Sequence, residues 1–279
     1  MSAPVSSNGS CARAVVRVDE LRKRYEAGVA ALDGVSFSVA PGEFVAVLGP
    51  SGAGKTTLFR CMTGLTRADG GSVLVRGQDI CRSRGLALRA ARQEMALIFQ
   101  QFNLVRRLTA HHNVLAGRLA HVPAWRVMLH RFARPDRQRA LACLDAVGLL
   151  ERAWTRADQL SGGQQQRVAI ARALAQEASV ILADEPVASL DPESAATVLD
   201  TLRAVARSGV AVVASLHQVH LAVAYAERII ALRSGRVVED APAGRLDERT
   251  LEQIYARTAP AGTVPERPHC SSAPQSLTL

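Results

Sequence analysis

The pattern of apolar residues differs between the first part of the chain and its second half. In its first part, short stretches of β-branched residues cluster or alternate with polar residues, which is typical of strands. These stretches are 15–18, 35–39 and 72–75. The pairs Asp33-Gly34 and Pro41-Gly42 favour turns, and we expect them to join these strands. In the second half, uninterrupted apolar runs alternate with helix-like segments, as buried parallel strands do. The runs are Val180–Ala183, Val210–Ala214 and Ile229–Leu232.

Residues from about 86 to 160 have a mainly helical pattern and contain no strong strand. The order of the patterns predicts an α/β fold with a parallel-sheet core, an N-terminal antiparallel β subdomain and a helical subdomain at about 86–165. Residues 1–13 are small and polar, and residues 258–279 are rich in Pro, Ser and Ala. We expect both ends to be disordered and residues 14–257 to form one domain.

Composition and charge exclude few classes of protein. The chain has 279 residues, 48% of them hydrophobic, and a formal net charge of +9. Because the basic residues are spread along the chain, we favour an arginine-rich composition over a nucleic-acid or anionic membrane surface, although the charge leaves both open. Five cysteines without a CxxC pair argue against a disulfide framework or zinc site and fit a reducing cytoplasm.

No segment predicts insertion into a membrane. No stretch approaches the ~20 apolar residues that a spanning helix needs, and residues 1–13 do not form a signal peptide. We therefore expect a soluble protein whose membrane role, if any, comes from its partners.

The first chemical motif follows the apolar run Phe44–Leu48 and precedes a helix-like segment that we expect to begin at Thr57. It reads Gly49, Pro50, Ser51, Gly52, Ala53, Gly54, Lys55 and Thr56. Glycines in a strand-to-helix turn let backbone N–H groups point at phosphate oxygens, and the helix adds its positive end. Lys55 would reach the β and γ phosphates, and the Thr56 hydroxyl would bind Mg²⁺.

The lysine strengthens this interpretation. A glycine-rich turn without a ligand would explain the glycines, but not Lys55 and Thr56 together. Lys23 and Lys55 are the lysines among 34 basic residues, and all others are arginines. A compact ammonium suits a phosphate in a tight loop better than a planar guanidinium.

The second motif is an apolar strand that ends in two carboxylates, Asp184 and Glu185, before Pro186. Asp184 could help to hold Mg²⁺, and Glu185 could polarise the water that attacks the γ-phosphate. Alone, the same residues would also fit an acidic turn that ends a strand. Downstream of a phosphate-binding loop, the catalytic interpretation is favoured.

The third motif is Leu160, Ser161, Gly162, Gly163 and Gln164, followed by a strong helix former. Ser161 is a candidate N-cap, and a simple cap with two glycines is the plainer interpretation. A second helix N-terminus with glycine amides is, however, also a phosphate site. One nucleotide does not need two such sites on one chain, so the motif favours a dimer in which each chain completes the other's site.

In this order, the three motifs resemble the ATP-binding cassette of ABC transporters, over about residues 14–255. The resemblance assigns further residues. Tyr25 matches the aromatic residue that stacks on adenine, and Gln100 matches the glutamine that links the metal site to the helical lid. Asp191, after Ser189-Leu190, matches a loop that contacts the opposite monomer, and His217 matches the histidine that contacts the γ-phosphate. Taken singly, each also has an ordinary structural interpretation, and Tyr25 is the weakest match.

The resemblance implies a transport ATPase with ATP and Mg²⁺ as ligands. The catalytic residues would be Glu185, His217 and Gln100, and the metal would be held by Thr56, Gln100 and Asp184. Nucleotide would also contact Tyr25, residues 49–57, Asp191 and, from a second copy, Ser161, Gly162, Gly163 and Gln164. The implied partners are this second copy, two transmembrane permease subunits and an extracytoplasmic binding protein, at the cytoplasmic side of the inner membrane, with no nucleic acid.

Several segments are similar to the phosphonate importer ATPases in particular. These are residues 99–108, 113–119, 125–132, 183–192 and 216–219. His220 departs from that pattern, which has an acidic residue there. An importer for phosphate or polar amino acids is the nearer alternative. A nucleic-acid ABC ATPase is a remoter one, since only 60 positions separate Gln100 from Leu160 and no long coiled coil intervenes. A metal shared by His217 and His220 lacks a clear third ligand.

Overall fold

The computed structural model describes residues 14–25, 28–99, 101–128 and 132–245, and two sheets organise this part of the chain. The smaller is antiparallel, in the order β2-β1-β4-β5. Its strands are β1 (Val16–Arg24), β2 (Ala30–Val39), β4 (Gly70–Val75) and β5 (Gln78–Asp79). Within the described ranges, no helix is both long and apolar enough to cross a bilayer.

The Asp33-Gly34 pair is not a turn, and this expectation is wrong. Both residues lie inside β2, where Leu21 pairs with Val35 and Arg22 pairs with Asp33, so that Gly34 is the extra residue of a β-bulge. Gly34 has a φ of 80°, a conformation that glycine adopts without strain. A glycine after an aspartate, which often marks a turn, therefore forms a β-bulge here. Pro41-Gly42 does form the turn between β2 and β3.

The larger sheet has the order β10-β9-β3-β8-β7-β6 and is parallel except for β10. Its strands are β3 (Phe44–Leu48), β6 (Met95–Ile98), β7 (Val180–Asp184), β8 (Ala211–Ser215), β9 (Arg228–Arg233) and β10 (Arg236–Pro242). Every residue of β3 and β8 is buried, which explains their unbroken apolar sequences. The predicted parallel core and the antiparallel β subdomain are both confirmed.

β6 corrects the expectation that residues 86–160 contain no strong strand. Its four residues, Met95–Ile98, pair in parallel with β7 and form one edge of the main sheet. Met, Ala and Leu are good helix formers, and four residues are too few to show a period. Pairing with β7 decides the conformation, and that contact is invisible in the local sequence.

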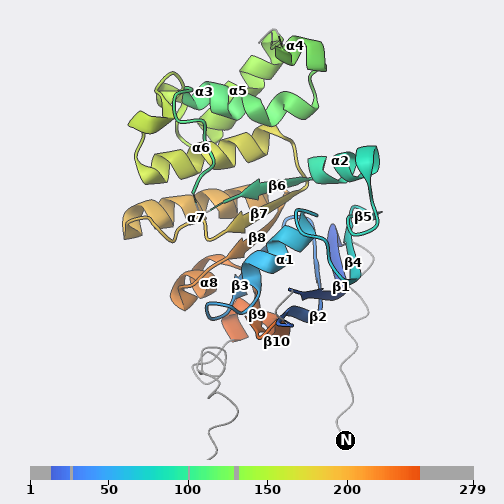
Figure 1. The fold of residues 1–279 in the computed structure, drawn as a ribbon. Helices are drawn as coiled ribbons and strands as arrows, with labels where there is room; N and C mark the ends of the chain where they lie inside the picture. The colour runs from blue at the N-terminus through green and yellow to red at the C-terminus, as the bar shows by residue number, and fades with distance from the viewer. Residues whose placement is uncertain (1–13, 26–27, 100, 129–131, 246–279) are drawn as a thin grey trace, which may run out of the picture.

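The main sheet is the middle layer of the core. Phe44, Ala46 and Leu48 face a cluster built with α5, α6 and α7, whereas Val45 and Val47 face a cluster built with the small sheet and α1. Figure 1 shows α3, α4 and α5 gathered beyond α6 at one end of the molecule, with α1 beside the small sheet. The helices are α1 (Lys55–Met62), α2 (Gly85–Gln93), α3 (Ala110–Leu115), α4 (Ala124–Met128), α5 (Arg134–Ala146), α6 (Gly162–Ala175), α7 (Pro192–Arg207) and α8 (Val219–Tyr225), with 3₁₀ turns η2 (Ala116–Ala120), η3 (Leu150–Arg152), η4 (Ala157–Gln159) and η5 (Ala243–Arg245).

Candidate nucleotide site

The glycine loop connects β3 to α1, which begins at Lys55, two residues before the expected start. Gly49 and Gly54 have φ values of 150° and 106°. A Cβ on Gly49 would lie 2.2 Å from the carbonyl oxygen of Leu232, and a Cβ on Gly54 would lie 2.4 Å from that of Ala31. Both positions therefore require glycine for two reasons, backbone conformation and close approach of neighbouring strands.

The Lys55 ammonium lies inside this loop. The residue is 5% exposed, and its Nζ donates to the carbonyl oxygens of Gly49 at 2.7 Å and Pro50 at 3.2 Å. Burial lowers the pKa of Lys55 from its ordinary value, while the charges of Glu185 and Asp184 act in the opposite direction. A buried cation held by backbone carbonyls at the base of a glycine loop is suited to an anionic ligand.

A cleft of about 380 Å³ opens above the loop, a size typical of small-molecule sites. It brings together the first two sequence motifs, although 128 positions separate Asp184 from Thr56 in the chain. The residues that line it are Ala31, Ser51, Gly52, Ala53, Gly54, Lys55, Thr56, Thr57, Glu185 and His217.

The two carboxylates stand at the end of β7, next to the end of β8. Ser215 donates from its hydroxyl to Asp184 Oδ1 at 2.8 Å, and the same hydroxyl accepts from the backbone N–H of Glu185 at 2.8 Å. Glu185 has a φ of 52°, in the left-handed region that side chains rarely adopt. The chain therefore turns sharply after Asp184, and Glu185 lines the cleft.

His217 also lines the cleft. Its Nε2 lies 2.5 Å from Glu185 Oε1, and the two side chains are 40% and 21% exposed. The structure thus joins the predicted catalytic glutamate and histidine in one contact that solvent and ligand can reach.

The third motif forms the start of α6, outside the lining of this cleft. Ser161 caps the helix as predicted, because its hydroxyl accepts from the backbone of Gln164 and its own N–H donates to the Gln164 side chain. Gly163 faces α7 closely, since a Cβ there would lie 2.8 Å from the Ser194 side chain. Asp191 caps α7 by accepting from the Ser194 N–H at 2.9 Å, and these hydrogen bonds lower the pKa of Asp191.

Two further predicted residues are Tyr25 and Gln100. Tyr25 follows β1, is 44% exposed, and lies with its ring centroid 5.7 Å from Lys23 Nζ. It is absent from the lining of the cleft. Gln100 lies outside the described residues. The loop just after it is held to α6, because Arg172 donates to the carbonyl oxygens of Asn103 at 2.6 Å and Phe102 at 3.2 Å.

Sequence reasoning missed two residues of the site. Ala31 lines the cleft only through its place in β2, and its residue type gives no signal. Ser215 gives one, because it is a polar residue at the end of an otherwise apolar run and is fully buried. A buried hydroxyl in such a place needs a partner, and here the partners are the two acidic residues.

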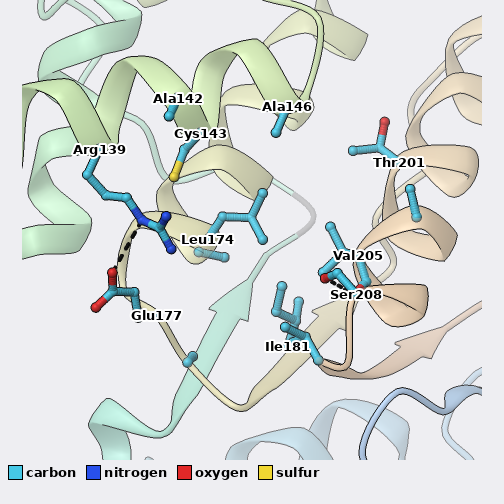
Figure 2. A pocket seen from close by; sticks show the side chains of 14 residues that line it. Arg139, Ala142, Cys143, Ala146, Leu174, Glu177, Ile181, Thr201, Val205 and Ser208 are labelled. Atoms are coloured by element: carbon cyan, nitrogen blue, oxygen red, sulfur yellow. Dashed lines mark hydrogen bonds and ion pairs between the residues drawn. The ribbon is translucent and has the colours of Figure 1, made fainter.

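A second groove, of about 460 Å³, lies between α5, α6 and α7 (Figure 2). Apolar side chains such as Cys143, Leu174 and Val205 dominate it, and Arg139 pairs with Glu177 at its edge at 3.2 Å. It contains neither the glycine loop nor the two carboxylates. The smaller, more polar cleft is therefore the better candidate for a phosphate ligand.

The described residues include possible metal-ligating side chains and three cysteines. Across those ranges, no group of three or more His, Cys, Asp or Glu side chains is placed to hold a metal ion, so His217 and His220 have no third such ligand. Cys61, Cys81 and Cys143 are free thiols. Burial raises the pKa of Cys61 to about 11.

The sequence model of the ABC transporter family matches residues 32–188, more than half of the chain. The chain belongs to the ABC transporter family. It is therefore a transport-coupled ATPase of that family, as the resemblance implied, and the predicted fold class is confirmed by solved cassettes. One of them is the dimeric ATP-binding cassette MJ0796 in a post-hydrolysis state bound to ADP and Pi. It shares 33% identity and a TM-score of 0.69, covering 82% of this chain and 98% of that one.

Curated members of the ABC family are more similar in sequence. The hypophosphite import ATP-binding protein HtxD of Stutzerimonas stutzeri is 48% identical over 86% of this chain and 70% of its own length. A phosphonates import ATP-binding protein, PhnC 1 of Rhodopseudomonas palustris, is 44% identical over 95% of this chain and 98% of its own length. Both names concern import of phosphorus compounds.

Proposed function

We propose that this ABC cassette is the energy-coupling ATPase subunit of a binding-protein-dependent importer for phosphonates. The observation that carries the proposal is the cleft in which the glycine loop, Glu185 and His217 meet. The cargo rests on similarity, because several relatives between 42% and 49% identical are named as phosphonates import ATP-binding proteins. The cassette itself would span residues 14–257, with the helical subdomain at about 86–165.

The chain's own groups would bind the ATP phosphates at the glycine loop. Backbone N–H groups of residues 51–54 would donate to the phosphate oxygens, and the start of α1 would add its dipole. Lys55 would exchange its contacts with the Gly49 and Pro50 carbonyls for contacts with the β and γ phosphates. Tyr25 would stack on adenine from the end of β1.

The residues also fit Mg²⁺. The Thr56 hydroxyl, in the lining of the cleft, and the Asp184 carboxylate, oriented by Ser215, are hard oxygen ligands of the kind that Mg²⁺ prefers. Gln100 would add an amide oxygen. The ion would neutralise charge that develops on the phosphates during hydrolysis.

Glu185 would accept a proton from the attacking water, and His217 would hold Glu185 and the γ-phosphate in line. Their 2.5 Å contact in the lining of the cleft, which the glycine loop shares, supports this pairing. The work of the protein is then largely positioning and charge stabilisation.

A second copy of this chain would complete the site. The α6 start, with Ser161, Gly162, Gly163 and Gln164, lies outside the cleft of its own chain, and its capped amides would contact the γ-phosphate bound by the partner. Asp191 would lie at the same interface. The dimeric state of the similar cassette MJ0796 supports this arrangement.

The importer would also contain two permease subunits and an extracytoplasmic solute-binding protein. This cassette would bind the permease on the cytoplasmic side of the inner membrane, through the helical region near residues 100–119, with no nucleic acid involved. ATP hydrolysis at the cleft would then drive movement of the permease.

One specific observation favours a second cargo. The relative that is 48% identical is named for hypophosphite import. Hypophosphite and phosphonates share a P–O anionic group, so related importers could differ only in their permease and binding protein. The experiment must therefore distinguish uptake of a phosphonate, of hypophosphite and of phosphate from one another.

Growth and labelled uptake in a strain that lacks this gene test the proposal. The strain would be complemented with the wild type or Glu185→Gln, with methylphosphonate, hypophosphite or phosphate as the sole phosphorus source. We expect methylphosphonate uptake to be restored by the wild type and not by Glu185→Gln, because the variant loses the group that activates water.

Half-buried Glu239 on β10 offers a matched control, since Glu239→Gln makes the same chemical change outside the cleft and should restore uptake. Normal methylphosphonate uptake without the gene would overturn the cargo. Restoration of hypophosphite uptake alone would move the assignment to that anion.

A further inference from the structure

Ser215 is a fully buried hydroxyl at the end of the central strand β8. The four residues before it, Ala211–Ala214, are apolar and buried. Burying a hydroxyl costs free energy unless it is hydrogen-bonded, and an alanine here would suit the apolar surroundings. The Ser215 hydroxyl therefore needs hydrogen-bond partners, a requirement that an alanine would not have.

Both hydrogen-bonding capacities of this hydroxyl are used on the two acidic residues. It donates to Asp184 Oδ1 at 2.8 Å and accepts from the Glu185 N–H at 2.8 Å. The first contact fixes one oxygen of the Asp184 carboxylate, leaving the other to a ligand. The second satisfies the N–H of Glu185, whose φ of 52° lies in the strained left-handed region.

The frame around Ser215 is rigid. In the parallel ladders, Ser215 is level with Asp184 on β7 and with Val47 on β3, the strand that leads into the glycine loop. The next residue, Leu216, donates its N–H to the Val47 carbonyl oxygen at 3.1 Å. The hydroxyl is thus tied to both halves of the cleft by backbone pairing, and its position does not depend on a mobile side chain.

We propose that Ser215 is a positioning residue for ATP hydrolysis. It orients the Asp184 carboxylate toward the metal and holds the backbone turn that brings the Glu185 carboxylate to His217. It acts through these residues and touches neither nucleotide nor water itself. The inference rests on the ATPase function proposed above, and it adds a residue that none of the three sequence motifs contains.

Ser215→Ala should separate catalysis from nucleotide binding. The Glu185 N–H and the Asp184 oxygen would each lose a partner, so both carboxylates would move from their catalytic positions. Changes to groups that orient metal ligands typically cost about 10–100-fold in activity or metal affinity, and we expect kcat to fall in that range. The glycine loop and Lys55 are untouched, so ATP affinity in EDTA should change less than threefold.

The experiment compares four variants of the full chain with the wild type. Ser215→Ala removes the hydroxyl, and Ser215→Cys keeps the side-chain size while weakening both hydrogen bonds. Ser215→Thr keeps the hydroxyl and should recover most of the rate. Ser208→Ala is the control, since the Ser208 hydroxyl donates to the Val205 carbonyl at 2.7 Å at the end of α7. Single-turnover hydrolysis, ATP affinity in EDTA, and Mn²⁺ affinity for the ATP complex by electron paramagnetic resonance are measured.

The proposal predicts a lower kcat and weaker Mn²⁺ binding for Ser215→Ala and Ser215→Cys, with unchanged ATP affinity in EDTA and recovery in Ser215→Thr. Wild-type rates and Mn²⁺ affinity in the Cys variant, which preserves packing, would overturn it. So would a loss in Ser215→Thr as large as in Ser215→Ala, because a purely steric role would then suffice. If the wild type and Ser208→Ala do not hydrolyse ATP, the proposed ATPase function fails first, and the two failures are distinct.

Discussion

At the scale of single residues, the site depends on one buried cation. Lys55 is held by two backbone carbonyls inside a loop in which Gly49 and Gly54 cannot be replaced without a clash. Lys23, the other lysine, lies on the small sheet and donates instead to a carboxylate, that of Asp69, at 3.0 Å. The pair allows the same chemical change to be made inside and outside the cleft.

Lys55→Ala should weaken ATP binding about a hundredfold, because charge-assisted hydrogen bonds to phosphate contribute about 1.5–3 kcal/mol each. Lys23→Ala should leave the dissociation constant within about twofold. Isothermal titration with ATP measures both. Equal affinity in wild type and Lys55→Ala would contradict the phosphate role of the loop.

The sequence predicts residue types at the site better than their conformations. The glycine loop, Asp184 and Glu185 were predicted because their chemistry requires particular residue types at a particular spacing, whereas His217 was predicted only from the family resemblance. The left-handed backbone of Glu185 and the bridging hydroxyl of Ser215 depend on how β7 and β8 end side by side. That relation between strands 31 positions apart is set by sheet pairing, which no local pattern records.

At the scale of elements, helix α6 is fixed by a close approach to η2. A Cβ on Gly117 would lie 2.3 Å from the backbone carbonyl oxygen of Arg172, an atom that cannot move without shifting α6. Gly117→Ala should destabilise the fold by about 1–3 kcal/mol, or roughly 2–10 °C in Tm. Gly244→Ala, where a Cβ would meet nothing within 4 Å, is the control for thermal unfolding. An unchanged Tm for Gly117→Ala would show that the helices separate without cost.

An ion pair between Asp33 on β2 and Arg236 on β10 joins the two sheets, with Arg236 Nη2 donating to Asp33 Oδ2 at 2.6 Å. This hydrogen bond lowers the pKa of Asp33 in the folded state. Its contribution to stability is therefore present above about pH 4, the unfolded pKa, and is lost as pH falls through the folded pKa.

Asp33→Asn should accordingly be less stable than the wild type at pH 7, and this difference should shrink as pH falls below about 4. Urea midpoints at several pH values measure this convergence. Asp200→Asn makes the same change at an exposed position on α7 and should run parallel to the wild type. A constant difference between wild type and Asp33→Asn at all pH values would contradict the assignment.

Helices and strands could be predicted where the apolar pattern is long, and the prediction failed where that pattern is short. The apolar runs of β7, β8 and β9 and the capped helix α6 are confirmed. β6, with four residues, and the bulge at Gly34 differ from the sequence prediction, because pairing with another strand, β7 for the first and β1 for the second, determined their conformation. Neither error touches the cleft, since the site is built from the elements with the strongest patterns.

At the scale of the whole molecule, one chain carries two half-sites. The cleft holds the glycine loop, Glu185 and His217, while the capped start of α6 lies outside it. The sequence already favoured a dimer because two phosphate-binding helix starts need two chains. The structure adds that the cleft and the start of α6 lie apart within one chain, and we therefore propose that completion of the site needs nucleotide and a second copy.

The most direct test of this account is the mass of Glu185→Gln in solution, measured by light scattering with saturating ATP and Mg²⁺ and again with ADP. The account predicts a dimer with ATP, since the variant binds nucleotide and hardly hydrolyses it, and a monomer with ADP. A monomer that has demonstrably bound ATP would contradict the claim that two copies of this chain close around the nucleotide.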